Sequence, residues 1–154
     1  MITVRSAQAT RLVPAPAEEI FALLASPAQH PVIDGSGMVR GVQERTPVRL
    51  SLGAKFGMQM QAGRAPYKIL NEVVEFEEGR RIAWRHFGGH IWRYTLEPVD
   101  EHVTKVTEEF DPSASRSPLV LRLIRASARN QRSIDRTLDR LVDWAADTSP
   151  TPIG

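Results

Sequence analysis

The fold is decided by residues 56–110, FGMQMQAGRAPYKILNEVVEFEEGRRIAWRHFGGHIWRYTLEPVDEHVTKVTEEF. In this stretch apolar or aromatic side chains recur at nearly every second position, and mostly Lys, Gln, Arg, Thr and Glu lie between them. The recurring positions are Phe56, Met58, Met60, Val74, Phe76, Ile82, Trp84, Trp92, Tyr94, Leu96, Val106 and Phe110. A period of two predicts β-strands with one buried and one exposed face. A strand meander with so aromatic a face needs a second layer to cover it.

Composition limits the classes of protein that the chain can represent. It has 154 residues, with 20 basic and 18 acidic side chains and no cysteine. This length favours a single domain over residues 1–147, followed by a frayed tail at 148–154. The lack of cysteine excludes disulfides and thiolate chemistry. No apolar run approaches the roughly 18 residues of a membrane span, and the N-terminus lacks a secretory pattern, so we expect a cytoplasmic protein.

Helices and further strands complete the order of elements. Pro16 suits the first turn of a helix, after which Ile20, Phe21 and Leu24 recur at helical spacing. The segment 27–37 is rich in helix breakers and allows at most one helical turn. Strands are expected at 2–13, 39–43, 53–61, 67–76, 80–87, 91–96 and 103–111. One long helix is expected from Pro118 to about Ala146.

Loop length predicts which side chains share the buried face. An odd-length loop, Gly88-Gly89-His90, pairs Trp84 with Tyr94. It also pairs His86 with Trp92, so that the even-numbered aromatic residues lie together. A two-residue turn would mix polar and apolar side chains on both faces. The odd loop is therefore the prediction.

The facing of strand 67–76 stays open at this stage. Val74 and Phe76 favour an inward set of even-numbered residues. Tyr67, Ile69 and Val73 favour an odd-numbered set.

The helix expected over residues 118–146 changes character along its length. Its half after Ile134 carries an ordinary apolar stripe, whereas Ser127, Asn130 and Gln131 interrupt the half before it. Buried polar groups need partners, and ligand pockets are mostly apolar with a few placed polar groups. The polar interruption therefore predicts a cavity between sheet and helix rather than a sealed core.

The same helix carries arginines at a spacing that follows one face. They are Arg122, Arg125, Arg129, Arg132, Arg136 and Arg140. One interpretation is a solvated face in which Asp135 and Asp139 are interleaved. The other is a surface that binds acidic protein or nucleic acid, although a net charge of +2 makes nucleic acid an unfavoured partner.

This order of elements resembles the helix-grip fold of the START-like, SRPBCC superfamily, to which Bet v 1-like proteins also belong. The closer likeness is to its polyketide cyclase/dehydrase and lipid-transport family. The residues that carry it are His30–Gly37, Lys55–Met58, Asn71–Phe76, Gly79–Arg85, Trp92–Pro98 and Val106–Asp111. The resemblance implies an α+β fold: a curved seven-stranded antiparallel sheet wrapped around a long C-terminal helix, with one or two short helices after the first strand. It also implies a cavity for hydrophobic or aromatic small molecules.

Two inward positions do not suit an ordinary core. His86 lies near the Gly-Gly turn, as a structural histidine at the rim of the sheet or as a donor or base near the cavity mouth. Glu108 points inward opposite Trp92, where a carboxyl group against an aromatic wall would have a raised pKa and could act as an acid. The alternative for Glu108 is an ion pair with an arginine such as Arg93.

A third candidate is the pair His30 and Asp34. On a helical turn their spacing would place them side by side, and a histidine–carboxylate pair can act as a base. Pro31 disfavours a helical conformation at His30. No metal site is expected, because the four histidines lack ligand spacing, and no cofactor is expected, because nucleotide-binding motifs are lacking.

Three functional hypotheses follow. The leading one is a domain that binds a hydrophobic aromatic, polyketide-like or acyl/lipid molecule, as a monomer or a homodimer. The predicted ligand-binding residues are Phe56, Met58, Met60, Trp84, His86, Trp92, Tyr94, Glu108, Leu123, Ser127, Asn130 and Gln131. The second is a cofactor-independent cyclase or dehydratase, whose only candidate catalytic residues are His30, Asp34, His86 and Glu108. The third is an interaction module that uses the arginine-rich helix.

Overall fold

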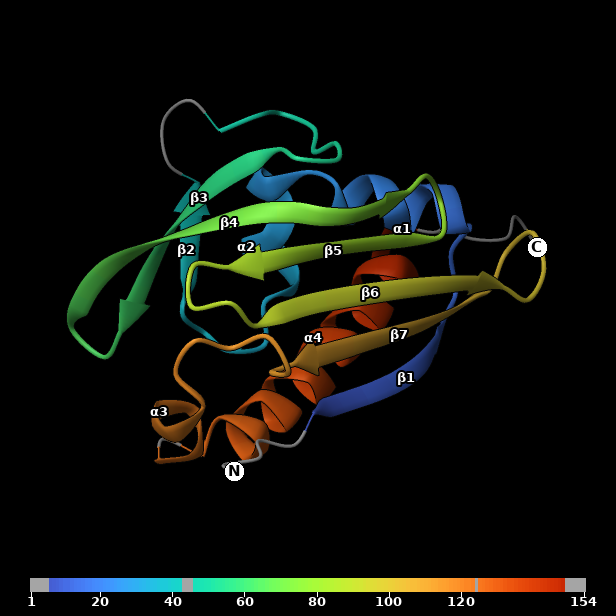
Figure 1. Cartoon of the computed structure of the whole chain (residues 1–154). Coiled ribbons are helices and arrows are strands. Elements are labelled where there is room, and N and C mark those ends of the chain that lie inside the picture. The colour runs from blue at the N-terminus through green and yellow to red at the C-terminus, as the bar shows by residue number, and fades with distance from the viewer. Residues whose placement is uncertain (1–5, 43–45, 124, 149–154) are drawn as a thin grey trace.

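The computed structural model describes residues 6–42, 46–123 and 125–148 (Figure 1). Seven strands and several helices make up this part of the chain, in the order β1 Ala7–Val13, α1 Ala17–Leu24, η1 Pro27–Gln29 (a 3-10 turn), α2 His30–Ile33, β2 Val39–Val42, β3 Lys55–Ala62, β4 Ala65–Glu77, β5 Arg81–His86, β6 Ile91–Pro98, β7 Thr104–Asp111, α3 Pro118–Leu123 and α4 Ala126–Thr148. The strands lie close to their predicted positions. Residues 2–5 and Gln43, which were included in predicted strands, lie outside the described residues.

The strands form one antiparallel sheet in the order β1-β7-β6-β5-β4-β3-β2. Figure 1 shows α4 lying across one face of this curved sheet, with α1 and α2 on the same side. Strand β1 pairs with β7, which closes the meander at its edge. The α+β helix-grip architecture predicted from the sequence is confirmed.

The core is filled under only part of α4. Ile134, Leu138, Leu141 and Ala145 are fully buried on its C-terminal half, and helix α1 completes the apolar layer there. Burial of this kind contributes about 25 cal/mol per Å² of apolar surface. The N-terminal half of α4 presents small or polar side chains instead, so the sheet beneath it is not packed in the same way.

The predicted parity of the β5–β6 hairpin is confirmed, but its register is wrong by two residues. Trp84 lies opposite Trp92, and Tyr94 lies opposite Ile82. The turn is again odd in length, and the backbone N–H of His86 donates to the carbonyl oxygen of residue 90 at 2.9 Å. A shift of two residues keeps every side chain on its face, so the inward set survives the error.

The register of β6 against β7 corrects the predicted neighbour of Glu108. Its partner across the β6–β7 ladder is Tyr94, whereas Trp92 lies opposite Phe110. The prediction that Glu108 faces inward is confirmed, since only 3% of the residue is exposed.

A β-bulge resolves the open question about β4. The register shifts between Val73 and Glu75, so that Val73 faces Trp84 on one side of the bulge and Phe76 pairs with Ile82 on the other. A bulge inserts one extra residue and thereby reverses the alternation of the strand. The inward-facing residues of β4 therefore have odd numbers before the bulge and even numbers after it. This explains why the sequence supported both sets.

The single C-terminal helix that we predicted over residues 118–146 is in fact two helices. Helix α3 ends at Leu123 and α4 begins at Ala126, and between them Arg125 adopts a left-handed backbone conformation with φ of 53°. A residue with a Cβ disfavours that conformation. The break divides the arginine stripe between two helices.

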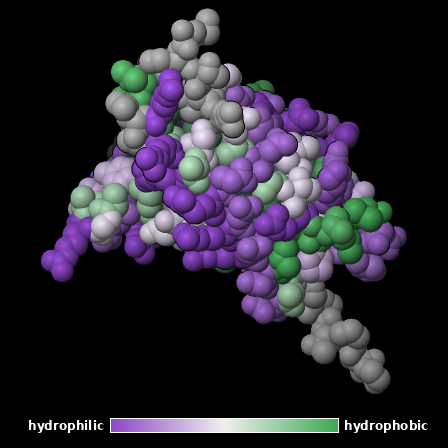
Figure 2. Space-filling view, turned by 90° about the horizontal axis from the view of Figure 1, so that it is seen from below, coloured by the Kyte–Doolittle hydropathy of each residue, from purple (hydrophilic) through white to green (hydrophobic). Residues whose placement is uncertain are grey.

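Figure 2, which views the molecule from below, shows a mainly hydrophilic surface with hydrophobic residues in separate groups.

Gly35 joins the segment after α2 to α4. Its backbone N–H donates to Thr137 Oγ1 at 2.9 Å. A Cβ atom at this position would lie 2.5 Å from both the carbonyl oxygen of Ser133 and the backbone nitrogen of Thr137. Glycine is therefore required by close approach of two backbones, and this contact closes one side of the space under α4.

We predict that Gly35→Ala destabilises the fold by roughly 1–3 kcal/mol, because the added methyl group overlaps backbone atoms of a helix that cannot yield locally. Gly41→Ala is the matched control, since its Cβ would meet only the flexible Gln59 side chain at 3.6 Å. Urea denaturation of the two variants checks this. Equal free energies of unfolding for the two variants would contradict the close approach.

Candidate functional site

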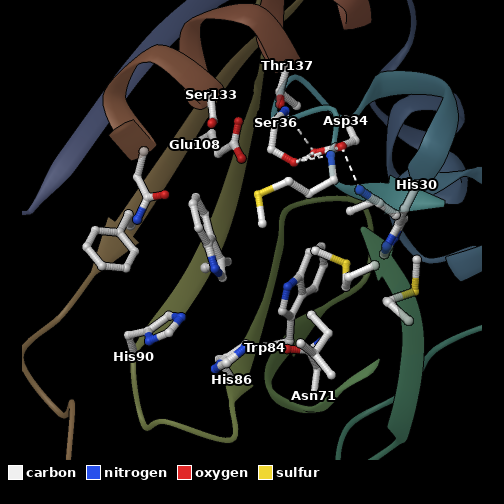
Figure 3. Close-up of a pocket in the computed structure, with 18 of the residues that line it drawn as sticks. His30, Asp34, Ser36, Asn71, Trp84, His86, His90, Glu108, Ser133 and Thr137 are labelled. Atoms are coloured by element: carbon white, nitrogen blue, oxygen red, sulfur yellow. Dashed lines mark hydrogen bonds between the residues drawn. The ribbon is translucent and has the colours of Figure 1, made fainter. Parts of the chain in front are cut away.

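A cavity of about 310 Å³ lies between the sheet and the N-terminal half of α4 (Figure 3). The volume is at the lower end of the range typical of small-molecule pockets. Its apolar wall is formed by Leu24, Ile33, Met38, Val39, Phe56, Met58, Met60, Ile69, Trp84, Trp92, Phe110, Leu121 and Ala126. Its polar side chains are His30, Asp34, Ser36, Tyr67, Asn71, His86, His90, Tyr94, Glu108, Arg129, Asn130, Ser133 and Thr137.

Aromatic rings line the sheet side of the cavity. The Trp84 ring is stacked on His30 at 5.0 Å between centroids and meets Phe56 edge-on at 5.5 Å. Trp92 lies 5.2 Å from Phe110. Such contacts hold the rings in place and leave flat apolar surfaces directed at the cavity.

Three buried side-chain atoms in the described residues have no hydrogen-bond partner, and all three belong to residues that line the cavity. They are Asn71 Oδ1, His90 Nδ1 and Glu108 Oε2. A buried polar group without a partner costs about 1–3 kcal/mol. The gathering of all three at one cavity indicates a space that polar atoms from outside the chain can complete.

Glu108 and Tyr94 form the inner polar pair of the site. The Tyr94 hydroxyl donates to Glu108 Oε1 at 2.8 Å. Burial raises the pKa of Glu108 to about 8, an effect that the Tyr94 hydrogen bond opposes and that Asp34 and Asp135 reinforce. Burial also raises the pKa of Tyr94, with Glu108 adding to the effect. At neutral pH both groups are therefore uncharged.

The arginine partner considered for Glu108 is engaged elsewhere. Arg93 points to the outer face, where it contacts Glu75 at 2.7 Å and Glu109 at 3.1 Å. Asp111 lies 3.6 Å from the same guanidinium group. An ion pair between Glu108 and Arg93 is thus wrong. Tyr94, the partner of Glu108, faces inward, and Arg93 faces outward because adjacent residues of a strand face opposite sides of the sheet.

His86 and His90 stack on each other at 4.4 Å between ring centroids. Burial lowers the pKa of both rings, and in His90 the neighbouring His86 contributes, so that the pKa of His90 falls to about 4. His86 Nδ1 accepts a hydrogen bond from the Gly88 N–H at 3.2 Å. The neutral His86 ring therefore carries its proton on Nε2 and has a donor there.

His30 and Asp34 do adopt helical spacing but do not pair. The backbone N–H of Asp34 donates to the carbonyl oxygen of His30 at 3.0 Å, while His30 Nε2 donates to the carbonyl oxygen of Leu24 at 2.8 Å. The Asp34 carboxylate accepts hydrogen bonds from the Ser36 hydroxyl at 2.7 Å and from the Val39 backbone N–H at 3.1 Å. Both side chains thus hold the segment that borders the cavity.

The polar groups of the site fall into two clusters. Figure 3 shows Glu108, Ser133, Thr137, Ser36 and Asp34 at one end, and Asn71, His86 and His90 at the other. Tyr94 on β6 belongs to the first cluster and His90, directly before β6, to the second, a separation of about 13 Å at the rise of a β-strand. Groups from the two clusters cannot reach the same ligand atom.

Nine of the residues predicted to bind a ligand line the cavity: Phe56, Met58, Met60, Trp84, His86, Trp92, Tyr94, Glu108 and Asn130. Gln131 and Ser127 do not line it. Gln131 instead exchanges hydrogen bonds with the backbone of Gln8, at 3.2 and 2.9 Å. The side chain of Leu123 lies outside the described part of the structure.

Sequence reasoning missed Asn71, His90, Ser133 and Thr137 as lining residues. The inward direction of Asn71 could not be assigned because the bulge of β4 was not predicted, and His90 was assigned to a turn. Ser133 and Thr137 are four residues apart, a spacing that places them on one face of the helix but does not show what this face meets.

A family model described as polyketide cyclase/dehydrase and lipid transport matches residues 4–145. The chain belongs to this family. The uncharacterized proteins Rv0088 and MT0096, from two strains of Mycobacterium tuberculosis, are each 36% identical to it over 138 residues. The match covers 87% of this chain and 61% of each relative, so the chain spans about three fifths of their length.

Solved structures share the fold of this family member. Protein CV1439 from Chromobacterium violaceum has a TM-score of 0.71 at 17% identity, with 92% of this chain and 98% of that chain covered. MLL2253 from Mesorhizobium loti also has a TM-score of 0.71, at 15% identity, with 95% and 100% covered. At these identities the likeness extends to the fold alone. Within the described residues of the family member, no helix is long and apolar enough to cross a membrane, and no group of three or more His, Asp or Glu residues is placed to hold a metal ion.

We predict that Glu108→Gln stabilises this family member progressively as pH rises from about 4.5 to 8. In that window the wild-type carboxyl group stays protonated when folded but ionises when unfolded, so wild-type stability falls as pH rises. Glutamine has no such dependence. The difference grows by several kcal/mol at most, since one pKa unit corresponds to about 1.4 kcal/mol.

Urea denaturation of both proteins at several pH values between 4.5 and 8.5 measures this difference. Glu72→Gln serves as control, because it removes an exposed carboxylate from the same sheet. A constant difference between Glu108→Gln and wild type across the range would contradict the raised pKa.

Proposed function

We propose that this protein binds a hydrophobic small molecule in the cavity between the sheet and α4. The observation that carries the proposal is the coincidence of an apolar, aromatic-lined cavity with the three unpartnered polar atoms on Asn71, His90 and Glu108. An apolar ligand body would bury against the rings. A few polar atoms on the ligand would supply the missing hydrogen bonds and thereby fix its orientation.

The side chains that line the cavity suit a ligand with a flat or flexible apolar body. Met38, Met58 and Met60 lie on its wall, and methionine adapts to irregular contents because its side chain is unbranched and polarizable. Trp84 and Trp92 offer flat surfaces. Membership of a polyketide cyclase/dehydrase and lipid transport family agrees with such a ligand.

Catalysis by the same site is the less supported alternative. A cyclase or dehydratase would need a base close to the acid Glu108. Asp34 lies at the same end of the cavity, but its carboxylate is already held by Ser36 and Val39. His86 and His90 lie at the other end, and His30 is bound to Leu24. The geometry therefore favours binding over acid–base chemistry.

The arginine-rich helix gives little support to an interaction module. Arg129 lines the cavity, and Arg140 donates to the backbone oxygen of Asp34. Two acidic residues of α4, Asp135 and Asp139, each contact Arg11 of β1 at 3.3 Å. Two arginines of the stripe, Arg129 and Arg140, thus belong to the cavity and its border, while Asp135 and Asp139 help to dock α4 on the sheet.

We predict that Ser133→Phe lowers the affinity for 1-aminoanthracene, an uncharged aromatic probe, at least about tenfold, because the added ring occupies space that the ligand needs. The probe becomes more fluorescent in apolar surroundings, so a titration gives the dissociation constant directly. Arg132→Phe is the matched control, since the neighbouring residue on α4 is exposed. It should bind the probe within about twofold of wild type.

Circular dichroism establishes that both variants are folded. Equal affinities for the two folded variants would place the binding site outside the cavity and overturn the proposal. Native mass spectrometry of protein purified from its own host provides a second measurement. A co-purifying small molecule lost from Ser133→Phe but retained by Arg132→Phe is the expected result.

A further inference from the structure

The inner end of the cavity has an unusual donor. Glu108 is 3% exposed, its Oε1 accepts the Tyr94 hydroxyl at 2.8 Å, and its Oε2 has no partner among the described residues. Glu108 lines the cavity together with Ser133 and Thr137 of α4. One oxygen of this carboxyl group is thus tied to the sheet, and the other is left for the contents of the cavity.

The protonation state decides what that second oxygen can bind. The pKa of about 8 leaves the carboxyl group protonated at neutral pH. Since Oε1 already accepts a hydrogen bond, the proton is best placed on Oε2, which then becomes a donor. The groups that shift the pKa of Glu108 are Tyr94 on β6, Asp34 after α2 and Asp135 on α4, and none of them is a cation. Arg11 on β1, the neighbouring strand, is held by Asp135 at 3.3 Å.

We propose that Glu108 selects an uncharged ligand oxygen, such as the carbonyl of a ketone or an ester, by donating a hydrogen bond from Oε2. This inference rests on the proposed ligand-binding function and specifies its ligand class. The ligand is a neutral, oxygenated hydrophobic molecule whose oxygen lies at the Glu108 end of the cavity and whose hydrocarbon part lies along Trp84 and Trp92.

The same end of the cavity discriminates against a carboxylate. An anion placed there would lose its hydration, and it would meet Asp34, whose charge already disfavours ionisation of Glu108. The one arginine that lines the cavity within the described residues is Arg129, which is exposed. Specificity therefore arises from the lack of a buried cation as much as from the donor.

Three probes of similar shape test the proposal: 2-acetylnaphthalene, a neutral ketone; 2-ethylnaphthalene, which lacks the oxygen; and 2-naphthoate, an anion. Equilibrium dialysis gives their dissociation constants with the full chain at pH 6.5 and 9.5. The readout is the ratio of ketone to hydrocarbon affinity, which cancels the shared burial of the rings.

In the wild type this ratio should fall about 3- to 10-fold between pH 6.5 and 9.5, the range expected for loss of one hydrogen bond. Glu108→Gln retains an N–H donor that does not titrate, so its ratio should be the same at both pH values. Glu108→Leu lacks the donor and should show the low ratio at both. At pH 6.5 the wild type should bind 2-naphthoate more weakly than the ketone.

The outcomes distinguish failure of this inference from failure of the proposed ligand-binding function. A ratio that is the same in wild type and Glu108→Leu, and unaffected by pH, overturns the role of Glu108 but leaves ligand binding intact. Binding of 2-naphthoate as tightly as the ketone also overturns the specificity. Failure of all three probes to bind the wild type would instead contradict the proposed function itself. The pH comparison of wild type with Glu108→Gln stands even if Glu108→Leu does not fold.

Discussion

The packing of α4 against the inner face of the sheet governs the rest of the molecule, because it is complete along only half of the helix. Ile134, Leu138 and Leu141 fill the space beneath the C-terminal half. Towards the N-terminal end, Asn130, Ser133 and Thr137 line a cavity instead. Because a helix is nearly straight and the sheet is curved, α4 can contact the sheet closely along only part of its length. The difference in side-chain size along α4 turns this geometry into a stable cavity.

Two devices keep the cavity open. Gly35 brings the segment after α2 directly onto the α4 backbone, which holds that side of the cavity in position. On the sheet side, His30, Phe56 and Trp84 brace one another through ring contacts. Neither device depends on a ligand. The site is therefore largely preformed, and binding would not require the chain to order a new segment.

The electrostatic character of the site follows from the same burial. Burial disfavours the charged form of every titratable group that it surrounds, so Glu108 gains a proton while His86 and His90 lose theirs. Glu108, His86 and His90 thus line the apolar space as neutral donors and acceptors. Charged arginines such as Arg93 are kept on the outer face, where Glu75 and Glu109 neutralise them.

Residue periodicity and loop length determined the strands and, outside β4, the inward-facing residues, Glu108 included. Alternation in a strand is a local property that neighbouring residues enforce. The order of residues along the expected C-terminal helix also revealed its polar half. Only the tertiary structure decided the register of Trp84, the break at Arg125, and the bulge after Val73 that turns Asn71 inward. It also decided that Gln131 binds Gln8 whereas Ser133 faces the cavity. These features depend on contacts between distant segments, so that no local pattern of residues could specify them.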